Sequence, residues 1–155
     1  MNKLADQFKE KSTYLGKMSI YKDKNGTQRI KFESEPSWST IRDMGDLVYF
    51  MYVGEKLMKI GKTEATNGFN DRANQYSQGE HKDKTNRKIF SVMRKLRRKV
   101  IDVYGISRPR QHTIIKCPIS GETYIRQLST ARIVEIDLTN QYLDDGHDLP
   151  FCTQN

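Results

Sequence analysis

The sequence predicts an α+β fold, in which a small three-stranded antiparallel sheet is flanked by helices and preceded by an N-terminal hairpin or arm. Residues 48–63 contain two short apolar runs, rich in β-branched and aromatic residues, around a Gly-Glu-Lys turn, which is typical of a β-hairpin. Residues 18–32 alternate around an Asn-Gly pair, a strong hairpin signal. Residues 85–104 and 130–142 place apolar side chains at the spacing of amphipathic helices.

The N-terminal part of the chain is expected to extend this core. Residues 1–17 are expected to form a short polar helix or arm before the hairpin of residues 18–32. A connector follows, in which Trp38 is predicted to be buried by packing. We therefore divide the chain into an N-terminal arm and hairpin extension, residues 1–47, and a core, residues 48–155, which pack together as one compact domain.

The second arm of the central hairpin has an unusual composition for a strand. Successive side chains of a strand face opposite ways. The alternation predicts one face with Leu57, Lys59 and Gly61, and an opposite face with Met58 and Ile60. A glycine at this position lets the chain leave the strand sharply or lets another group approach closely.

Tyr49 lies on the first arm of the same hairpin. A buried tyrosine needs a partner for its hydroxyl, and a cation on the neighbouring strand, such as Lys59, is a candidate. The alternative is an ordinary aromatic residue beside a lysine whose stem covers the sheet while its amine reaches solvent. Lys62 and Thr63 present a second cation and a hydroxyl where the strand ends.

Arg72 lies on a short helix after the hairpin, which Asn70 or Asp71 is expected to cap. Thr85 is expected to cap the long helix that ends before Gly105. The polar faces of this helix carry a run of Lys and Arg, which is either solvated or bound to a phosphate backbone. The residues predicted to contact phosphates there, at the end of the hairpin and in the next loop are Lys62, Arg94, Lys95, Arg97, Arg98, Arg108 and Arg110.

The C-terminal part is predicted to contain the third strand and the last helix. Residues 113–117 are expected to form the strand, and Ser129 or Thr130 is expected to cap the helix. The apolar stripe of this helix consists of Ala131, Val134, Leu138 and Tyr142. Glu135 lies at the edge of that stripe, and after Gly146 ends the helix the chain is expected to return to the core.

The charge balance indicates an anionic partner. The sequence has 27 Lys and Arg against 19 Asp and Glu, a formal charge of +8, which suits nucleic acid, although a basic surface without a partner is the alternative. No apolar run approaches the ~20 residues of a membrane span, and the first residues lack the core of a signal peptide. Cys117 and Cys152 lie far apart without metal-binding spacing, so we expect no zinc site, no disulfide and a cytoplasmic location.

Two motifs of the central hairpin resemble those of a known enzyme family. Val-Tyr-Phe at residues 48–50, followed by Lys-Ile-Gly-Lys-Thr at residues 59–63, resembles the core of the GIY-YIG nucleases. More narrowly, it resembles the branch with lysine in place of the second motif tyrosine, which includes small phage-encoded nucleases and some type II restriction endonucleases. Further family landmarks occur in order along residues 48–155: Arg72, Glu135 and Asn155.

The chain departs from the family pattern at two points. The first motif reads Val-Tyr-Phe where the family has Gly-Ile-Tyr, so its tyrosine is Tyr49 or, alternatively, Tyr52. Many relatives have histidine four residues after the helix arginine, where this chain has Tyr76. Tyr76 lies one helical turn after Arg72 and faces the same way, and the resemblance implies that Asn155 orients a group of the site.

The resemblance implies phosphodiester hydrolysis with a divalent metal, Mg²⁺ or Mn²⁺, and Glu135 as its single protein ligand. Arg72 would stabilise the phosphoryl oxygens, because its guanidinium can donate two parallel hydrogen bonds. Tyr49 would act as a base or would orient the attacking water, with Lys59 beside it. Without the resemblance, Glu135 fits a structural ion pair with Arg or Lys.

The expected function is therefore that of a metal-dependent endonuclease acting on double-stranded DNA, of the restriction or phage type. A homodimer, at least on DNA, is a further expectation, and the N-terminal hairpin is expected either to form that dimer or to contact DNA. The alternative is a non-catalytic DNA- or RNA-binding module on the same basic scaffold. An RNA-associated protein is disfavoured because the sequence contains neither an RRM motif nor a KH loop.

Overall fold

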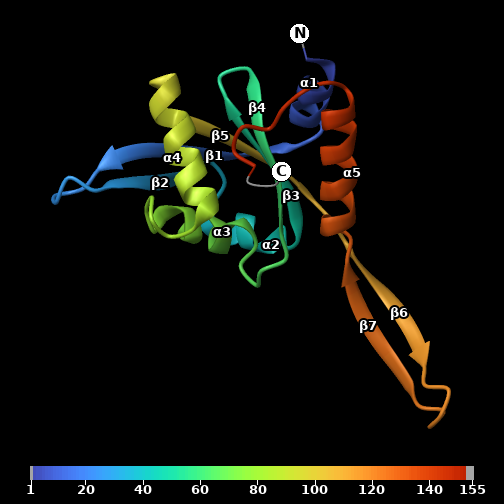
Figure 1. Cartoon of the computed structure of the whole chain (residues 1–155). Helices are drawn as coiled ribbons and strands as arrows, with labels where there is room; N and C mark the ends of the chain where they lie inside the picture. Colours follow the sequence, from blue (N-terminus) through green and yellow to red (C-terminus); the bar gives the residue numbers. More distant parts are fainter. Residues whose placement is uncertain (1, 153–155) are drawn as a thin grey trace.

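A five-stranded antiparallel sheet runs through the middle of the molecule, and helices cover both of its faces (Figure 1). The computed structural model describes residues 2–152. The strands are β1 (Thr13–Lys22), β2 (Gln28–Ser34), β3 (Leu47–Val53), β4 (Lys56–Thr63) and β5 (Val100–Ser107), and they lie in the order β2-β1-β5-β3-β4. The predicted α+β class is confirmed, but the predicted sheet of three strands is too small.

The N-terminal extension supplies the two additional strands. After α1 (Lys3–Glu10), β1 pairs with β2 on one side and with β5 on the other, so the hairpin predicted over residues 18–32 is part of the central sheet. Trp38 begins the short helix α2 (Trp38–Asp43) and is 50% exposed. The predicted burial of Trp38 is therefore wrong, because α2 turns Ile41 toward the core instead.

The predicted long helix is a helix followed by a strand. α4 (Lys84–Leu96) ends where Arg97 adopts a left-handed backbone conformation, with φ of 53°. The chain then enters β5, in which Ile101 and Val103 are buried and the residues beside them are more exposed. A short apolar run fits a helix or a strand equally well. Here the pairing of β5 with two neighbouring strands decides the outcome.

Two predicted helix caps are also wrong. Asp83, and not Thr85, caps α4, because its carboxylate accepts a hydrogen bond from the backbone of the first turn. In α3 (Phe69–Ser77) neither Asn70 nor Asp71 is the cap, since the helix begins after a glycine that has no side chain to accept a bond.

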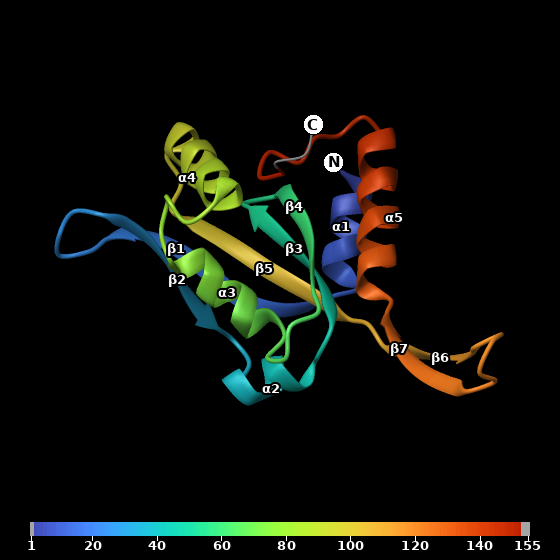
Figure 2. The same ribbon diagram turned by 60° about the horizontal axis from the view of Figure 1, so that its bottom comes forward.

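Residues 113–117 were predicted to be the third strand beside the central hairpin, but the strand that pairs with β3 is β5. Those residues lie mostly in β6 (Arg110–Lys116), which pairs with β7 (Thr123–Ser129) in a separate hairpin. Figure 2 shows that this hairpin projects away from the rest of the molecule. We call residues 110–129 the arm, and the remainder of the described chain the body.

Two hydrophobic clusters pack against opposite faces of the sheet. α3 and α4 lie over one face, and α1 and α5 (Ala131–Asp144) lie over the other (Figures 1 and 2). On the α3–α4 face the cluster includes Tyr49, Met51, Met58, Phe69, Tyr76 and Phe90. On the α1–α5 face it includes Phe8, Phe50, Tyr52, Leu57, Ile60 and Tyr142. The sheet is therefore the middle of three layers.

A β-bulge in the central hairpin decides which way the side chains of β4 face. Leu57 pairs with Tyr52. Lys59 pairs with Met51, which leaves Met58 as an extra residue. The strict alternation predicted for this strand is therefore wrong, because Leu57 and Lys59 align with residues that belong to opposite faces of the sheet.

The last helix and the segment after it agree with the predictions. The apolar stripe of α5 packs on the sheet through Ala131, Val134, Leu138 and Tyr142. At its start Ser129 Oγ accepts the N–H of the first helical residue, whereas Thr130 makes no such bond. Gly146 follows the helix with φ of 87°, and the chain returns to the core through the buried Leu149 and Phe151.

Candidate active site

A buried, hydrogen-bonded group of three side chains lies between β3 and α3. The hydroxyl oxygens of Tyr49 and Tyr76 are 2.7 Å apart, and Arg72 Nε donates to the Tyr49 hydroxyl at 3.1 Å. Both tyrosines are almost fully buried. The Arg72 guanidinium also lies over the Tyr76 ring, 5.1 Å from its centre. Arg72 and Tyr76 meet because residues four apart share one side of a helix.

Gly61 on β4 makes room for the Tyr49 ring. The two residues are opposite each other in the β3–β4 pairing. A Cβ atom on Gly61 would lie 2.2 Å from Cζ of the tyrosine, so no larger residue fits there without displacing the ring. Of the two roles predicted for this glycine, close approach by another group is the one that the structure has. The partners of the Tyr49 hydroxyl come from α3, and not from Lys59 as the sequence suggested.

The charges in this group are held in one state. Burial opposes the positive charge of Arg72, but the oxygens of Tyr49 and Tyr76 outweigh burial and raise the pKa of the guanidinium. Burial and the adjacent Tyr49 hydroxyl raise the pKa of Tyr76 well above its usual value, and Arg72 only partly offsets this. Tyr76 therefore stays a neutral phenol near pH 7 and can donate its proton in a hydrogen bond.

Glu135 on α5 is half-buried and lies within electrostatic reach of the same group. Burial raises the pKa of its carboxyl, while the positive charges of Lys59, Lys62, Arg132 and Arg72 act in the opposite direction. Tyr49 and Arg72 belong to the α3 side of the sheet, and α5 covers the other side. β4, which carries Lys59 and Lys62, is the edge strand between these two sides, and the charge of Arg72 acts on Glu135 from the opposite side of the sheet.

Two members of this neighbourhood were not predicted. Gln75 Oε1 accepts a hydrogen bond of 2.6 Å from Arg72 Nη1, which fixes the guanidinium from outside. Arg132 acts electrostatically on Glu135 from one turn earlier in α5. The spacing of three residues in each pair was a usable signal, since residues three apart are neighbours on a helix. Asn155, a predicted member, lies outside the described residues.

The predicted phosphate-contacting residues divide into two groups at opposite ends of the β3–β4 hairpin. Arg98 lies beside its turn, 3.9 Å from where a Cβ of Gly54 would be. Arg110 lies at the other end, where it binds Asp46. At about 3.3 Å per residue, the eight residue steps from Asp46 to Gly54 separate the two ends by about 26 Å. The turn-side group consists of Arg94, Lys95, Arg97 and Arg98, and the other of Lys62, Arg108 and Arg110.

Some of these cations are already paired. Arg94 forms a salt bridge with Glu80, Lys62 lies 3.2 Å from a carboxylate oxygen of Glu64, and Arg110 makes two hydrogen bonds to Asp46 of 2.9 and 3.0 Å. Within residues 2–152, Lys95, Arg97, Arg98 and Arg108 form no ion pair. Of the seven predicted residues, these four side chains are the ones without a carboxylate partner in that range that would compete with an anionic ligand.

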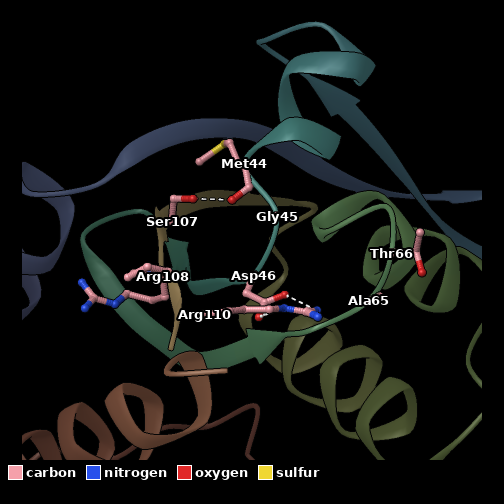
Figure 3. Close-up of a pocket in the computed structure, with 9 residues that line it drawn as sticks. Met44, Gly45, Asp46, Ala65, Thr66, Ser107, Arg108 and Arg110 are labelled. Atoms are coloured by element: carbon pink, nitrogen blue, oxygen red, sulfur yellow. Dashed lines mark hydrogen bonds and ion pairs between the residues drawn. The ribbon is translucent and has the colours of Figure 1, made fainter. Parts of the chain in front are cut away.

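An open pocket adjoins the end of β4 (Figure 3). Asp46 is buried, and its hydrogen bonds with Arg110 lower the pKa of its carboxyl. The side chain of Arg108 points away from this pair in Figure 3, and its Nε atom is buried without a hydrogen-bond partner in the part of the chain described. Because Arg110 makes two hydrogen bonds to Asp46 across the pocket, this pair holds the surrounding loops together.

The single carboxylate of the site, Glu135, fits a magnesium ion that takes most of its ligands from water and the substrate. In residues 2–152 no group of three or more His, Cys, Asp or Glu side chains could enclose a metal. Glu135 offers one hard carboxylate, and Mg²⁺ in proteins is commonly held by one or two carboxylates together with water and substrate phosphates. The donor set fits such an ion and does not fit a zinc site built from protein side chains.

None of the described helices is long and apolar enough to span a membrane.

The fold is similar to that of two nucleases of known structure. The restriction endonuclease HPY188I in complex with product DNA aligns with 97% of this chain and 84% of its own, with a TM-score of 0.56 and 19% sequence identity. A mutant of bacteriophage T4 EndoII aligns with 91% of this chain and 93% of its own, with a TM-score of 0.59 and 18% identity. No family model matches the sequence, and neither does any curated protein. At these identities the likeness establishes a shared fold.

Proposed function

We propose that this chain is a DNA endonuclease of the GIY-YIG type, which hydrolyses phosphodiester bonds with a divalent metal, Mg²⁺ or Mn²⁺. The observation that carries the proposal is the buried group of Tyr49, Tyr76 and Arg72 beside the half-buried Glu135. The order of the motifs along residues 48–135 and the fold shared with a restriction endonuclease support it.

Glu135 is the proposed protein ligand of the metal. A bound divalent ion would supply charge stabilisation at the phosphate and a more acidic water. The carboxylate must be ionised for this role. Burial raises its pKa and opposes ionisation, and the positive charges of Lys59, Lys62, Arg132 and Arg72 offset burial in part. These positive charges all act on the Glu135 carboxylate, so it has a structural as well as a chemical reason to be there.

Arg72 and the two tyrosines are proposed to act on the scissile phosphate and the attacking water. The guanidinium of Arg72 carries a permanent charge and is fixed by Tyr49 and Gln75, so it is positioned in advance to stabilise charge that develops on the phosphoryl oxygens. Tyr76 stays protonated and can donate to the Tyr49 oxygen. The Tyr49 oxygen then accepts from both Arg72 and Tyr76, so its own O–H is left to donate to a water and orient it for attack.

The basic residues are proposed to hold the DNA backbone on either side of this centre. Of the surrounding positive charges, those of Lys59 and Lys62 lower the pKa of Glu135 most. The unpaired Lys95, Arg97 and Arg98 lie toward the other end of the hairpin. Two cationic regions about 26 Å apart would span roughly eight base pairs of B-DNA at 3.4 Å per step.

A plasmid-nicking assay with Mg²⁺ or with EDTA tests the proposal. We expect cleavage in Mg²⁺ that EDTA removes, and a loss of at least about 100-fold in rate for Glu135→Gln or Arg72→Ala. The matched control is Glu55→Gln in the exposed hairpin turn, which should cleave at the wild-type rate. Circular dichroism and a DNA-binding titration check that each variant folds and binds.

Two outcomes would contradict this assignment. Full activity of Glu135→Gln would remove the metal ligand from the proposal, and full activity in EDTA would remove the metal. A wild-type chain that binds DNA with a strong salt dependence and never cleaves it would instead support the alternative, a binding module. The free cations Lys95, Arg97 and Arg98 are the observation that favours that alternative.

A further inference from the structure

The arm exposes apolar side chains on both of its faces. On one face Ile114 and Ile125 pair across the strands and are 71% and 70% exposed. On the other face Ile115, Tyr124 and Leu128 are each about half exposed. β6 and β7 contact chiefly each other, and an isolated two-stranded hairpin is marginally stable in water. Contiguous exposed apolar surface of this kind marks a binding surface.

One face of the arm forms a groove with a cation in it. The groove is lined by Ile115, Tyr124, Arg126 and Leu128 of this face, and by Ile125, whose side chain belongs to the other face. Arg126 is exposed and forms no ion pair with the described residues. A segment that fills this groove should therefore be apolar and should carry an acidic side chain.

The outer face of α5 has that composition. Ile133, Ile136 and Leu143 are 69%, 49% and 47% exposed, and they lie on the side of the helix away from the sheet. Asp137 and Asp144 lie between them on the same side, are exposed, and form no ion pair in the part of the chain described. We call these five residues the acidic face of α5.

The arm cannot cover the acidic face of its own helix. β7 ends at Ser129 and α5 begins at Ala131, so the arm joins one end of the helix directly. Figures 1 and 2 show it extending away from that end. Among residues 2–152 of a single copy, the acidic face and the groove therefore remain without a partner.

We propose that two copies of this chain form a symmetric dimer, in which the groove of each arm holds the acidic face of α5 of the other copy. Such an interface is self-complementary, because each copy supplies one groove and one helix face. Arg126 then faces Asp137 or Asp144, and the apolar residues of both surfaces become buried together. DNA fits the groove less well, since its apolar side chains would face a polyanion. This inference does not depend on the proposed nuclease activity.

Sedimentation equilibrium of the full chain, without DNA, tests the dimer through a charge exchange. We expect the wild type to sediment with twice the 18.1 kDa mass of the chain. Arg126→Glu alone, and Asp137→Lys with Asp144→Lys alone, should each weaken self-association at least about tenfold, because like charges then meet in both interfaces. Mixing the two variants should restore a dimer, since one interface then pairs an acidic arm with a basic helix face and the other keeps the wild-type charges.

The control variant makes the same reversal, from a positive to a negative side chain, at a site outside the arm and α5. Lys22→Glu is exposed on the N-terminal hairpin and should leave the mass of the wild type unchanged. Circular dichroism checks that each variant is folded. A wild type that is monomeric at all concentrations, or one that dimerises only when DNA is added, would overturn the proposal. It would also be overturned if the variants stayed dimeric alone, or stayed monomeric when mixed.

Discussion

The hairpin of β3 and β4 and the hairpin of the arm are both antiparallel pairs of similar length, but they differ in how far their side chains are buried. Every residue of β3 is buried, whereas in β6 and β7 nearly every residue is exposed. The reason is the covering of the faces: helices lie on both sides of β3 and β4, and on neither side of the arm. A covered hairpin can fix polar groups such as the Tyr49 hydroxyl in one geometry. An uncovered one keeps its apolar surface available to another molecule.

Within the two hairpins, the largest effect is expected from a side chain added at the most tightly packed point of the covered one. Gly61→Ala places a methyl group in the Tyr49 ring, so we expect a loss of about 3 kcal/mol in the free energy of unfolding. Gly121→Ala at the tip of the arm meets open space and should cost only about 1 kcal/mol, from its positive φ. Urea denaturation of both variants measures the difference. Equal losses would show that the close approach at Gly61 does not constrain the body.

A smaller effect is expected when one hydroxyl of the buried tyrosine pair is removed. Tyr76→Phe leaves the Tyr49 oxygen with a single partner in a buried place, which should cost about 1–2 kcal/mol. The comparison is Tyr124→Phe on the arm, whose exposed hydroxyl donates to Glu122 and should matter by less than about 0.5 kcal/mol. Thermal unfolding of both variants distinguishes them. If Tyr76→Phe were neutral, the pair would contribute nothing to the fold.

The smallest effect is expected from truncating an apolar side chain of the arm. In the Arg126→Glu background, which should be monomeric, Ile125→Ala is expected to change the free energy of unfolding by less than about 0.5 kcal/mol, because the side chain is 70% exposed. Ile101→Ala in the same background removes a fully buried side chain and should cost about 2–5 kcal/mol. Urea denaturation measures both. A large cost for Ile125 would mean that the arm packs against its own body.

Part of the fold and of the site could be predicted because it depends on neighbours in the chain. The Asn-Gly turn between β1 and β2 and the apolar stripe of α5 both occur as predicted. Arg72 and Tyr76 meet because they are four residues apart on one helix. Burial of Trp38 was a wrong prediction, since the size of an aromatic side chain does not say whether the core has room for it.

Other features could not be predicted because they depend on partners that are remote in the sequence. The apolar residues after Arg97 fit a helix or a strand, and only pairing with β1 and β3 made them β5. The phosphate-binding role predicted for Arg110 took no account of Asp46, which neutralises its charge across the pocket. No local pattern signals such a pair.

By itself the sequence determined the basic charge, the α+β class and the order of Tyr49, Arg72 and Glu135 along the chain. Only the tertiary structure decided that β1 and β2 join the central sheet, that a bulge turns Leu57 away from Lys59, and that the charge of Arg72 acts on Glu135. The physical reason is that periodicity and charge are properties of successive residues. Which strands pair, and which side chains meet around an edge, follows from the burial that the whole chain can achieve.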